Sequence, residues 1–134
     1  MNMEQLAAHL LQNEYCKHIG LEIETLEPGY AVGSLALDQK LINPLGTMHG
    51  GVLFSLADIV AGFAATAHGY LVTTISGDIN YVNPAVQTKR VICEAKEVRY
   101  GSHIGVYDVE IKNDNGNILC KATFSYFRLE QKVD

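Results

Sequence analysis

The stretch Asn43–Gly69, which reads NPLGTMHGGVLFSLADIVAGFAATAHG, decides the fold of this chain. The sixteen residues that start at Val52 include only three with polar side chains, namely Ser55, Asp58 and Thr66. A helix that is apolar on nearly every side belongs inside a protein core. The sequence therefore predicts a buried helix from about His49 to Ala67. The carboxylate of Asp58 then needs a partner in the fold or a ligand in a cavity, because an unpaired buried charge is costly.

Residues at both ends of this stretch carry the signals of helix termini. Thr47 is the expected N-cap, because its hydroxyl can accept a hydrogen bond from a free amide of the first turn. Gly69 fits the C′ position, where a left-handed backbone favours glycine. His68 lies in the last turn, where the helix dipole favours histidine, so we interpret it as a helix-end residue and not a catalytic one.

The segments before the central helix predict a short helix and a hairpin. Residues 3–14 place apolar side chains at helical spacing, which indicates an amphipathic helix. Residues 21–26 and 30–37 read as two strands joined by a Pro-Gly turn. Residues 38–46 contain Pro44 and Gly46, which interrupt regular structure, so we expect a loop there.

After Gly69 the chain alternates apolar and polar residues, which is typical of antiparallel strands with one buried face. The expected strands cover residues 71–82, 89–100, 103–113 and 117–129. The alternation slips near Lys96-Glu97, which predicts a bulge. Residues 114–116, Asp-Asn-Gly, predict a hairpin turn.

Together these elements predict one α+β domain that spans residues 1–134. Five or six antiparallel strands would present one apolar face, and the long helix is the element available to cover it. We therefore expect the strands to wrap around one long central helix.

Composition narrows the classes of function. The net charge is −5 and the ten basic residues are scattered, which argues against nucleic acid as a partner. Cys16, Cys93 and Cys120 lack metal-ligand spacing, so we expect no metal, and buried thiols in a reducing compartment. The amino terminus lacks a signal-peptide pattern, and the apolar run is too short for a membrane span. These features predict a soluble, cytoplasmic protein with no membrane partner.

Residues 49–51, His-Gly-Gly, begin the central helix, where backbone N–H groups are free and the helix dipole is positive. Such a terminus suits an anion, either a phosphate or a developing oxyanion. Asp58 is a candidate general base or nucleophile, and the two features together indicate acyl transfer or hydrolysis. Structural explanations stay open: the glycines permit close packing, the histidine satisfies a loop carbonyl, or Asp58 accepts a buried hydrogen bond from Ser76 or Tyr81.

Gly50 and Asp58 are eight residues apart, which places them about 12 Å from each other along a helix. An oxyanion donor must lie about 3 Å from the reacting oxygen, and the base must reach the same centre. One helix cannot supply both groups, whereas two copies related by a two-fold axis can. We therefore expect at least a homodimer, with the strand around Thr73–Tyr81 as a candidate pairing edge.

Residues 43–51, NPLGTMHGG, followed by Leu56-Ala57-Asp58, resemble the active-site segment of the hotdog-fold acyl-CoA thioesterases, and most closely the PaaI-like (phenylacetyl-CoA thioesterase) branch. The similarity covers most of the chain. It implies an antiparallel sheet wrapped around the central helix and hydrolysis of an acyl-CoA to a free acid and CoA. It also implies no cofactor apart from the CoA of the substrate, and a homo-oligomer that is commonly a tetramer among relatives.

The resemblance also implies roles for individual residues. The amide of Gly50 would polarise the thioester carbonyl, while Asn43 and His49 would shape and hydrogen-bond the reacting group. Asp58 of the other subunit would activate water or attack directly. Ser76 would orient the water.

A second set of residues is expected to contact the substrate, namely Gly51, Phe54, Asn80, Tyr81, Arg99 and His103. Phe54 and Tyr81 fit either an aryl or a medium-chain acyl pocket. Relatives often carry a basic Gly-Arg or Gly-Lys pair after the fourth strand that meets the CoA phosphates. Here Arg99 and His103 are the candidates for that role, with a polar hairpin turn as the alternative.

Two other functions remain as alternatives. A non-catalytic acyl-CoA-binding module or sensor would bind the same ligand without releasing thiol. A hotdog hydratase or dehydratase would act on enoyl- or hydroxyacyl-thioesters. We rank it lower, because Asp58 lacks a histidine partner for an acid–base pair and His49, at the helix start, does not supply one.

Overall fold

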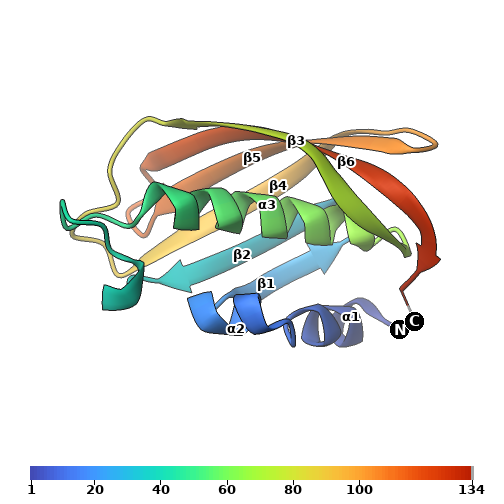
Figure 1. Cartoon of the computed structure of the whole chain (residues 1–134), viewed down its shortest axis with the longest axis horizontal. Coiled ribbons are helices and arrows are strands. Elements are labelled where there is room, and N and C mark those ends of the chain that lie inside the picture. The colour runs from blue at the N-terminus through green and yellow to red at the C-terminus, as the bar shows by residue number, and fades with distance from the viewer. Residues whose placement is uncertain (134) are drawn as a thin grey trace.

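The computed structural model describes residues 1–133, so Asp134, the last residue of the expected domain, lies outside it. Its elements are α1 (Met3–Leu10), α2 (Glu14–Ile19), β1 (Glu22–Glu27), β2 (Tyr30–Ala36), a short 3-10 helix (Gln39–Leu41), α3 (Gly50–Thr66), β3 (Tyr70–Tyr81), β4 (Arg90–Tyr100), β5 (Ile104–Asn113) and β6 (Ile118–Lys132). The six strands form one antiparallel sheet in the order β1-β2-β4-β5-β6-β3. Figure 1 shows this sheet curving around α3, with α1 and α2 beside β1. The predicted α+β architecture with a wrapped helix is confirmed.

The period-two pattern of the strands gives the sheet one apolar and one charged face. Side chains directly opposite each other on paired strands share a face. One such row across β4, β5 and β6 is buried against α3 and consists of Cys93, Ile111 and Cys120. The next row along the strands faces away from the helix and consists of Glu94, Glu110 and Lys121.

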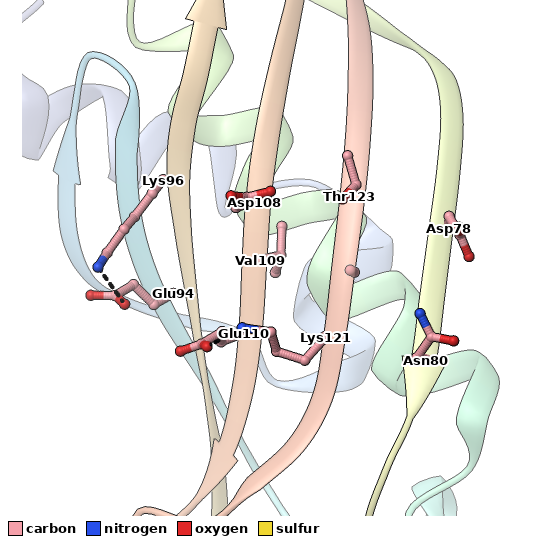
Figure 2. A pocket seen from close by; sticks show the side chains of 10 residues that line it. Asp78, Asn80, Glu94, Lys96, Asp108, Val109, Glu110, Lys121 and Thr123 are labelled. Carbon is pink, nitrogen blue, oxygen red and sulfur yellow. Dashed lines mark hydrogen bonds and ion pairs between the residues drawn. The ribbon is translucent and has the colours of Figure 1, made fainter.

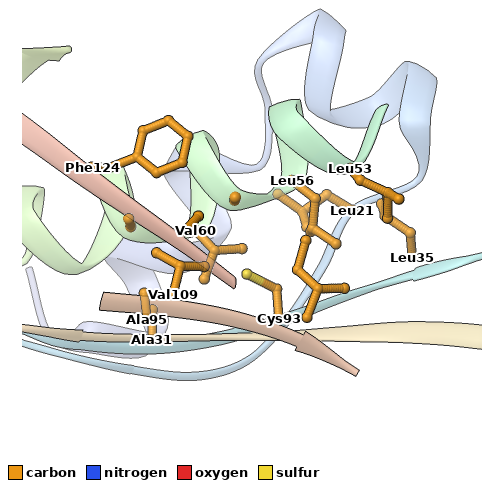
Figure 3. Packing of buried hydrophobic residues seen from close by; sticks show 14 of the residues in the cluster. Leu21, Ala31, Leu35, Leu53, Leu56, Val60, Cys93, Ala95, Val109 and Phe124 are labelled. Atoms are coloured by element: carbon orange, nitrogen blue, oxygen red, sulfur yellow. The ribbon is translucent and has the colours of Figure 1, made fainter. Parts of the chain in front are cut away.

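Small side chains allow α3 to lie close to the sheet (Figure 3). Alanines are fully buried on both sides of this contact, Ala57, Ala61 and Ala64 on the helix and Ala31 and Ala95 on the strands. A tight approach occurs at Gly33 of β2, where a Cβ would lie 2.8 Å from Cγ2 of Val60 and 3.2 Å from Cδ1 of Ile23. The missing side chain at Gly33 therefore sets how near the helix can come.

The amino-terminal helix differs from the prediction. The sequence indicated one helix over residues 3–14, whereas α1 ends at Leu10 and α2 begins at Glu14. Asn13 separates them, because its side chain accepts hydrogen bonds from two amides of the following turn and so caps a second helix. Apolar residues continue through the break, so their spacing alone did not reveal it.

At the start of α3 the predicted N-cap was wrong. His49 is the N-cap, because Nδ1 of its ring accepts a hydrogen bond of 2.8 Å from the amide of Gly51. The hydroxyl of Thr47 lies instead 2.7 Å from Nδ2 of Asn43 and belongs to the preceding loop.

At the end of α3 the capping interpretation of His68 was also wrong. Its Nε2 atom lies 2.7 Å from Oε1 of Glu97, and its ring stacks on Tyr100 with centroids 3.7 Å apart. Ala67 is the C-cap, so Gly69 lies one residue beyond C′, and its φ of 114° still requires glycine. Among residues 1–133, no helix has the length and apolar character needed to cross a bilayer.

Strand β3 is an edge of the sheet and pairs with β6 alone within the described part of the chain. Its residues from Thr73 to Asp78 are all exposed. The pairing is irregular between Thr74 and Ser76, and a second irregularity in β4, between Glu97 and Arg99, lies next to the predicted bulge. The edge position predicted for this strand is confirmed, while its pairing with a second copy stays a prediction.

Replacing Gly33 by alanine tests the close packing of α3. We expect Gly33→Ala to lower the free energy of unfolding by about 1–3 kcal/mol, because the added methyl group overlaps Val60. Gly62→Ala is the matched control, since a Cβ there would lie at an ordinary 3.5 Å from Tyr126 and alanine favours a helix by about 0.5–1 kcal/mol over glycine. Denaturant unfolding of both variants at one protein concentration measures the difference. Equal stabilities would contradict the packing described above.

Candidate active site

Gly50 provides the free donor at the amino end of α3. Of the first four amides of this helix, that of Gly51 bonds to the His49 ring, and those of Val52 and Leu53 bond to the His49 carbonyl at 3.0 and 3.2 Å. Within residues 1–133, no hydrogen bond uses the N–H of Gly50. A free amide at the positive end of a helix can stabilise a developing negative charge on an oxygen.

A cleft of about 340 Å³ opens in front of this amide. Its lining includes Gly50 together with Asn43, Met48, Leu53, Tyr81 and Pro84. The hydroxyl of Tyr81 donates a hydrogen bond of 2.7 Å to the carbonyl of Gly50 and so joins β3 to the start of the helix. Gly50 therefore lines a cleft of mixed character, in which the polar side chains of Thr47 and Asn83 accompany the apolar ones.

Asn43 holds the loop that forms one wall of this cleft. Its Oδ1 atom accepts hydrogen bonds from the amides of Leu45 and Thr47 at 3.0 and 3.1 Å, and its Nδ2 atom donates to the Thr47 hydroxyl. Asn43 thus shapes the approach to Gly50, and one N–H of its amide group remains for a ligand.

Asp58 lies halfway along α3 and is partly exposed. Its Oδ1 atom accepts hydrogen bonds from the hydroxyls of Thr74, at 2.8 Å, and Tyr126, at 3.1 Å. Its Oδ2 atom takes part in no hydrogen bond within residues 1–133. The carboxylate is therefore held at one oxygen and open at the other.

The partners of Asp58 differ from those that the sequence suggested. Sequence analysis named Ser76 or Tyr81 as possible donors, whereas the structure places Thr74 and Tyr126 there. Thr74 and Tyr126 are paired across β3 and β6, so they share the face that looks toward α3. Only the strand register brings them together, and the sequence carried no signal for that register.

Asp58 and Gly50 stay apart within one chain. Helix α3 is uninterrupted from Gly50 to Thr66, so the eight residues between them correspond to about 12 Å. The structure brings Asn43, His49, Gly51 and Tyr81 together around Gly50, whereas Asp58 lies two turns away.

The other predicted site residues lie in different places. Phe54 packs its ring edge-on against Phe124, with centroids 5.1 Å apart. Arg99 and His103 flank the β4–β5 turn, where the His103 ring stacks on Phe127 with centroids 5.7 Å apart. Ser76 is exposed on the edge strand.

Asn80 points away from the helix, into a charged groove on the outer face of the sheet (Figure 2). This groove has a volume of about 360 Å³ and its charges are partly paired, with Lys96 at 3.6 Å from Glu94 and Lys121 bonded to Glu110. Asn80 is thus separated from Gly50 by the sheet itself.

The cysteines do not supply a nucleophile. Burial raises the pKa of the Cys120 thiol to about 11, and burial also raises the pKa of Cys16 and of Cys93, so the thiols stay protonated near neutral pH. Across residues 1–133, no cluster of His, Cys, Asp or Glu side chains has the arrangement of a metal site.

The sequence and the structure of this chain are both similar to those of known thioesterases. Residues 45–120 match the thioesterase superfamily. The chain is 30% identical over 110 residues to the acyl-coenzyme A thioesterase PaaI of Escherichia coli, an alignment that covers 81% of this chain and 79% of that protein. The solved structure of E. coli PaaI superposes with a TM-score of 0.92 over 98% of this chain and 96% of that one, at 26% identity.

A second solved relative carries a ligand. A hypothetical thioesterase protein from Streptococcus pneumoniae, solved with coenzyme A, superposes with a TM-score of 0.80 at 31% identity and covers 84% of this chain and 91% of that one. Residues 45–120, which match the thioesterase superfamily, include Gly50 and Asp58 of α3. By sequence and by fold, this chain belongs to the thioesterase superfamily, as a PaaI-like thioester hydrolase with the hotdog fold.

Proposed function

We propose that this protein hydrolyses an acyl-CoA thioester to a free acid and CoA, at a site formed by Gly50 of one subunit and Asp58 of a second copy. The observation that carries the proposal is the N–H of Gly50, which no hydrogen bond within residues 1–133 uses and which opens on a cleft. The coenzyme A in the S. pneumoniae relative supports the choice of thioester.

The chemistry follows from the two groups. The N–H of Gly50 binds the thioester oxygen, which becomes negatively charged as the carbonyl carbon is attacked. Asp58 either removes a proton from the attacking water or attacks the carbon itself, giving an anhydride that water then opens. In both routes the carbon–sulfur bond breaks, and the CoA thiolate leaves and takes up a proton.

Two subunits are needed because of the geometry of α3. The 12 Å between Gly50 and Asp58 along one helix exceeds the reach of two groups that act on one carbonyl. A two-fold axis that sets two copies of α3 antiparallel would bring the Gly50 of each toward the Asp58 of the other. The exposed edge strand β3 supports this arrangement, since a long unpaired edge favours pairing with another chain.

The cleft indicates the class of acyl group. A volume of about 340 Å³ lies within the roughly 300–1,000 Å³ usual for small-molecule sites, and Met48, Leu53 and Tyr81 give its wall apolar surface. We propose an aryl or a medium-chain acyl group, with Arg99 and His103 as candidates for contact with the CoA phosphates.

A thiol-release assay over aryl, short, medium and long acyl-CoAs tests the reaction and the acyl class together. We expect the highest kcat/KM for aryl or medium-chain substrates, because the size of the cleft and the apolar part of its wall match these groups. Saturable acyl-CoA binding without thiol release would show a non-catalytic binding module and would overturn the proposal.

Gly50→Pro removes the free N–H and keeps the backbone conformation at the start of α3. Proline is favoured at the first position of a helix, and His49, with φ −58° and ψ 135°, already has the extended conformation that proline requires of its predecessor. We expect kcat to fall by about 10²–10³-fold, the usual effect of losing one oxyanion donor. Gly50→Ala is the control, because it keeps the N–H and its Cβ would lie 3.4 Å from the Tyr81 ring. An equal loss in both variants would mean that bulk, and not the N–H, matters.

Co-expression of Asp58→Asn with Gly50→Pro tests whether the site is shared. Each variant alone should lose about 10²-fold or more of kcat. In mixed dimers one of the two sites combines an intact Gly50 with an intact Asp58, so random pairing should restore about a quarter of the wild-type activity. If both groups act within one subunit, the mixture will stay as inactive as its components.

A further inference from the structure

We infer that Tyr126 is a positioning residue for the reaction, because it holds Oδ1 of Asp58 and so leaves Oδ2 as the oxygen that meets water or the thioester. The inference rests on the proposed catalytic role of Asp58. It adds a residue of β6 that lies far from Asp58 in the sequence and outside the motif around α3.

Both hydrogen bonds of the Tyr126 hydroxyl go to Asp58. Its hydroxyl lies 3.1 Å from Oδ1 of the carboxylate and also donates to the backbone carbonyl of the same residue. The hydroxyl of Thr74 reaches the same Oδ1 from the opposite strand at 2.8 Å. The Tyr126 hydroxyl shares its single proton between the Asp58 carbonyl and Oδ1, while Thr74 donates to Oδ1 alone. Together these contacts resist rotation of the carboxylate, and Oδ2 keeps all its lone pairs for the reaction.

Tyr126 is itself fixed and stays protonated. Its side chain is 2% exposed, and its ring meets that of Tyr107 edge-on, with centroids 5.8 Å apart. Burial raises the pKa of its hydroxyl, and the nearby charge of Asp58 raises it further, so the group remains a donor. A rigid, neutral donor can orient a carboxylate without competing for the substrate.

Burial also separates the role of Tyr126 from that of a catalytic acid. The hydroxyl points at Asp58 from within the core, and a substrate cannot reach a side chain that is 2% exposed. Thr74, by contrast, is exposed on the edge strand. Tyr126 therefore acts through Asp58 and not on the thioester.

Tyr126→Phe removes the hydroxyl and keeps the ring. We expect kcat to fall about tenfold while KM stays within about twofold, because the loss affects the orientation of the carboxylate in the transition state and not binding of the substrate. Tyr107→Phe is the matched control: that side chain is also fully buried, its ring touches the same core, and its hydroxyl donates to Glu97 at 2.9 Å. The control should keep the wild-type kcat.

The Asp58→Asn background distinguishes positioning from a structural role. If Tyr126 acts through Asp58, adding Tyr126→Phe to Asp58→Asn should change the residual kcat by less than about twofold. An equal fall in both backgrounds, or an equal fall with Tyr107→Phe, would overturn the inference. So would a wild-type kcat in Tyr126→Phe alongside an inactive Asp58→Asn, which would leave the proposed function intact. A fully active Asp58→Asn would instead refute the proposed function.

Discussion

The packing of an almost wholly apolar helix against a single curved sheet is the constraint on which the rest of this structure depends. Helix α3 has no polar face to offer to water, so the sheet must curve around it. The curvature is possible because glycine and alanine form much of the contact, and Gly33 lets Val60 come nearer than any side chain there would permit. The packed helix consequently holds its side chains and its terminal amides, including Asp58 and the N–H of Gly50, at fixed separations.

Under the proposed function, the rigidity of α3 explains why an amide and a carboxylate on one helix would need a second subunit to act on one thioester. Gly50 and Asp58 cannot approach each other without breaking α3, and breaking α3 would expose the core. Pairing across the exposed β3 edge would protect unpaired backbone groups and complete the site in one step. Under the proposed function, the same pairing of two subunits across β3 would therefore both stabilise the dimer and complete the active site.

The support of Asp58 also comes from the edge of the sheet. Thr74 belongs to β3 and Tyr126 to its neighbour β6, and their cross-strand pairing sets both hydroxyls over the same carboxylate oxygen. The strand that is free to pair with another chain therefore also fixes the acid. A one-residue slip of β3 against β6 would turn the Thr74 hydroxyl to the outer face, because successive side chains on a strand point in opposite directions. Tyr126 would stay on the inner face, since β6 is also paired with β5.

The sequence by itself determined the central helix, the six strands within a few residues, the free amides at the helix start and the acid within the helix, because each depends on local composition or on a short periodicity. It misassigned the helix caps at Thr47 and His68 and joined α1 to α2, since a capping side chain depends on which polar group lies nearest in space. Tertiary structure alone decided that Thr74 and Tyr126 hold Asp58 and that Asn80 faces the outer groove. These features follow from strand register and from contacts between residues distant in the chain. Neither can be read from the periodicity of residues along the sequence.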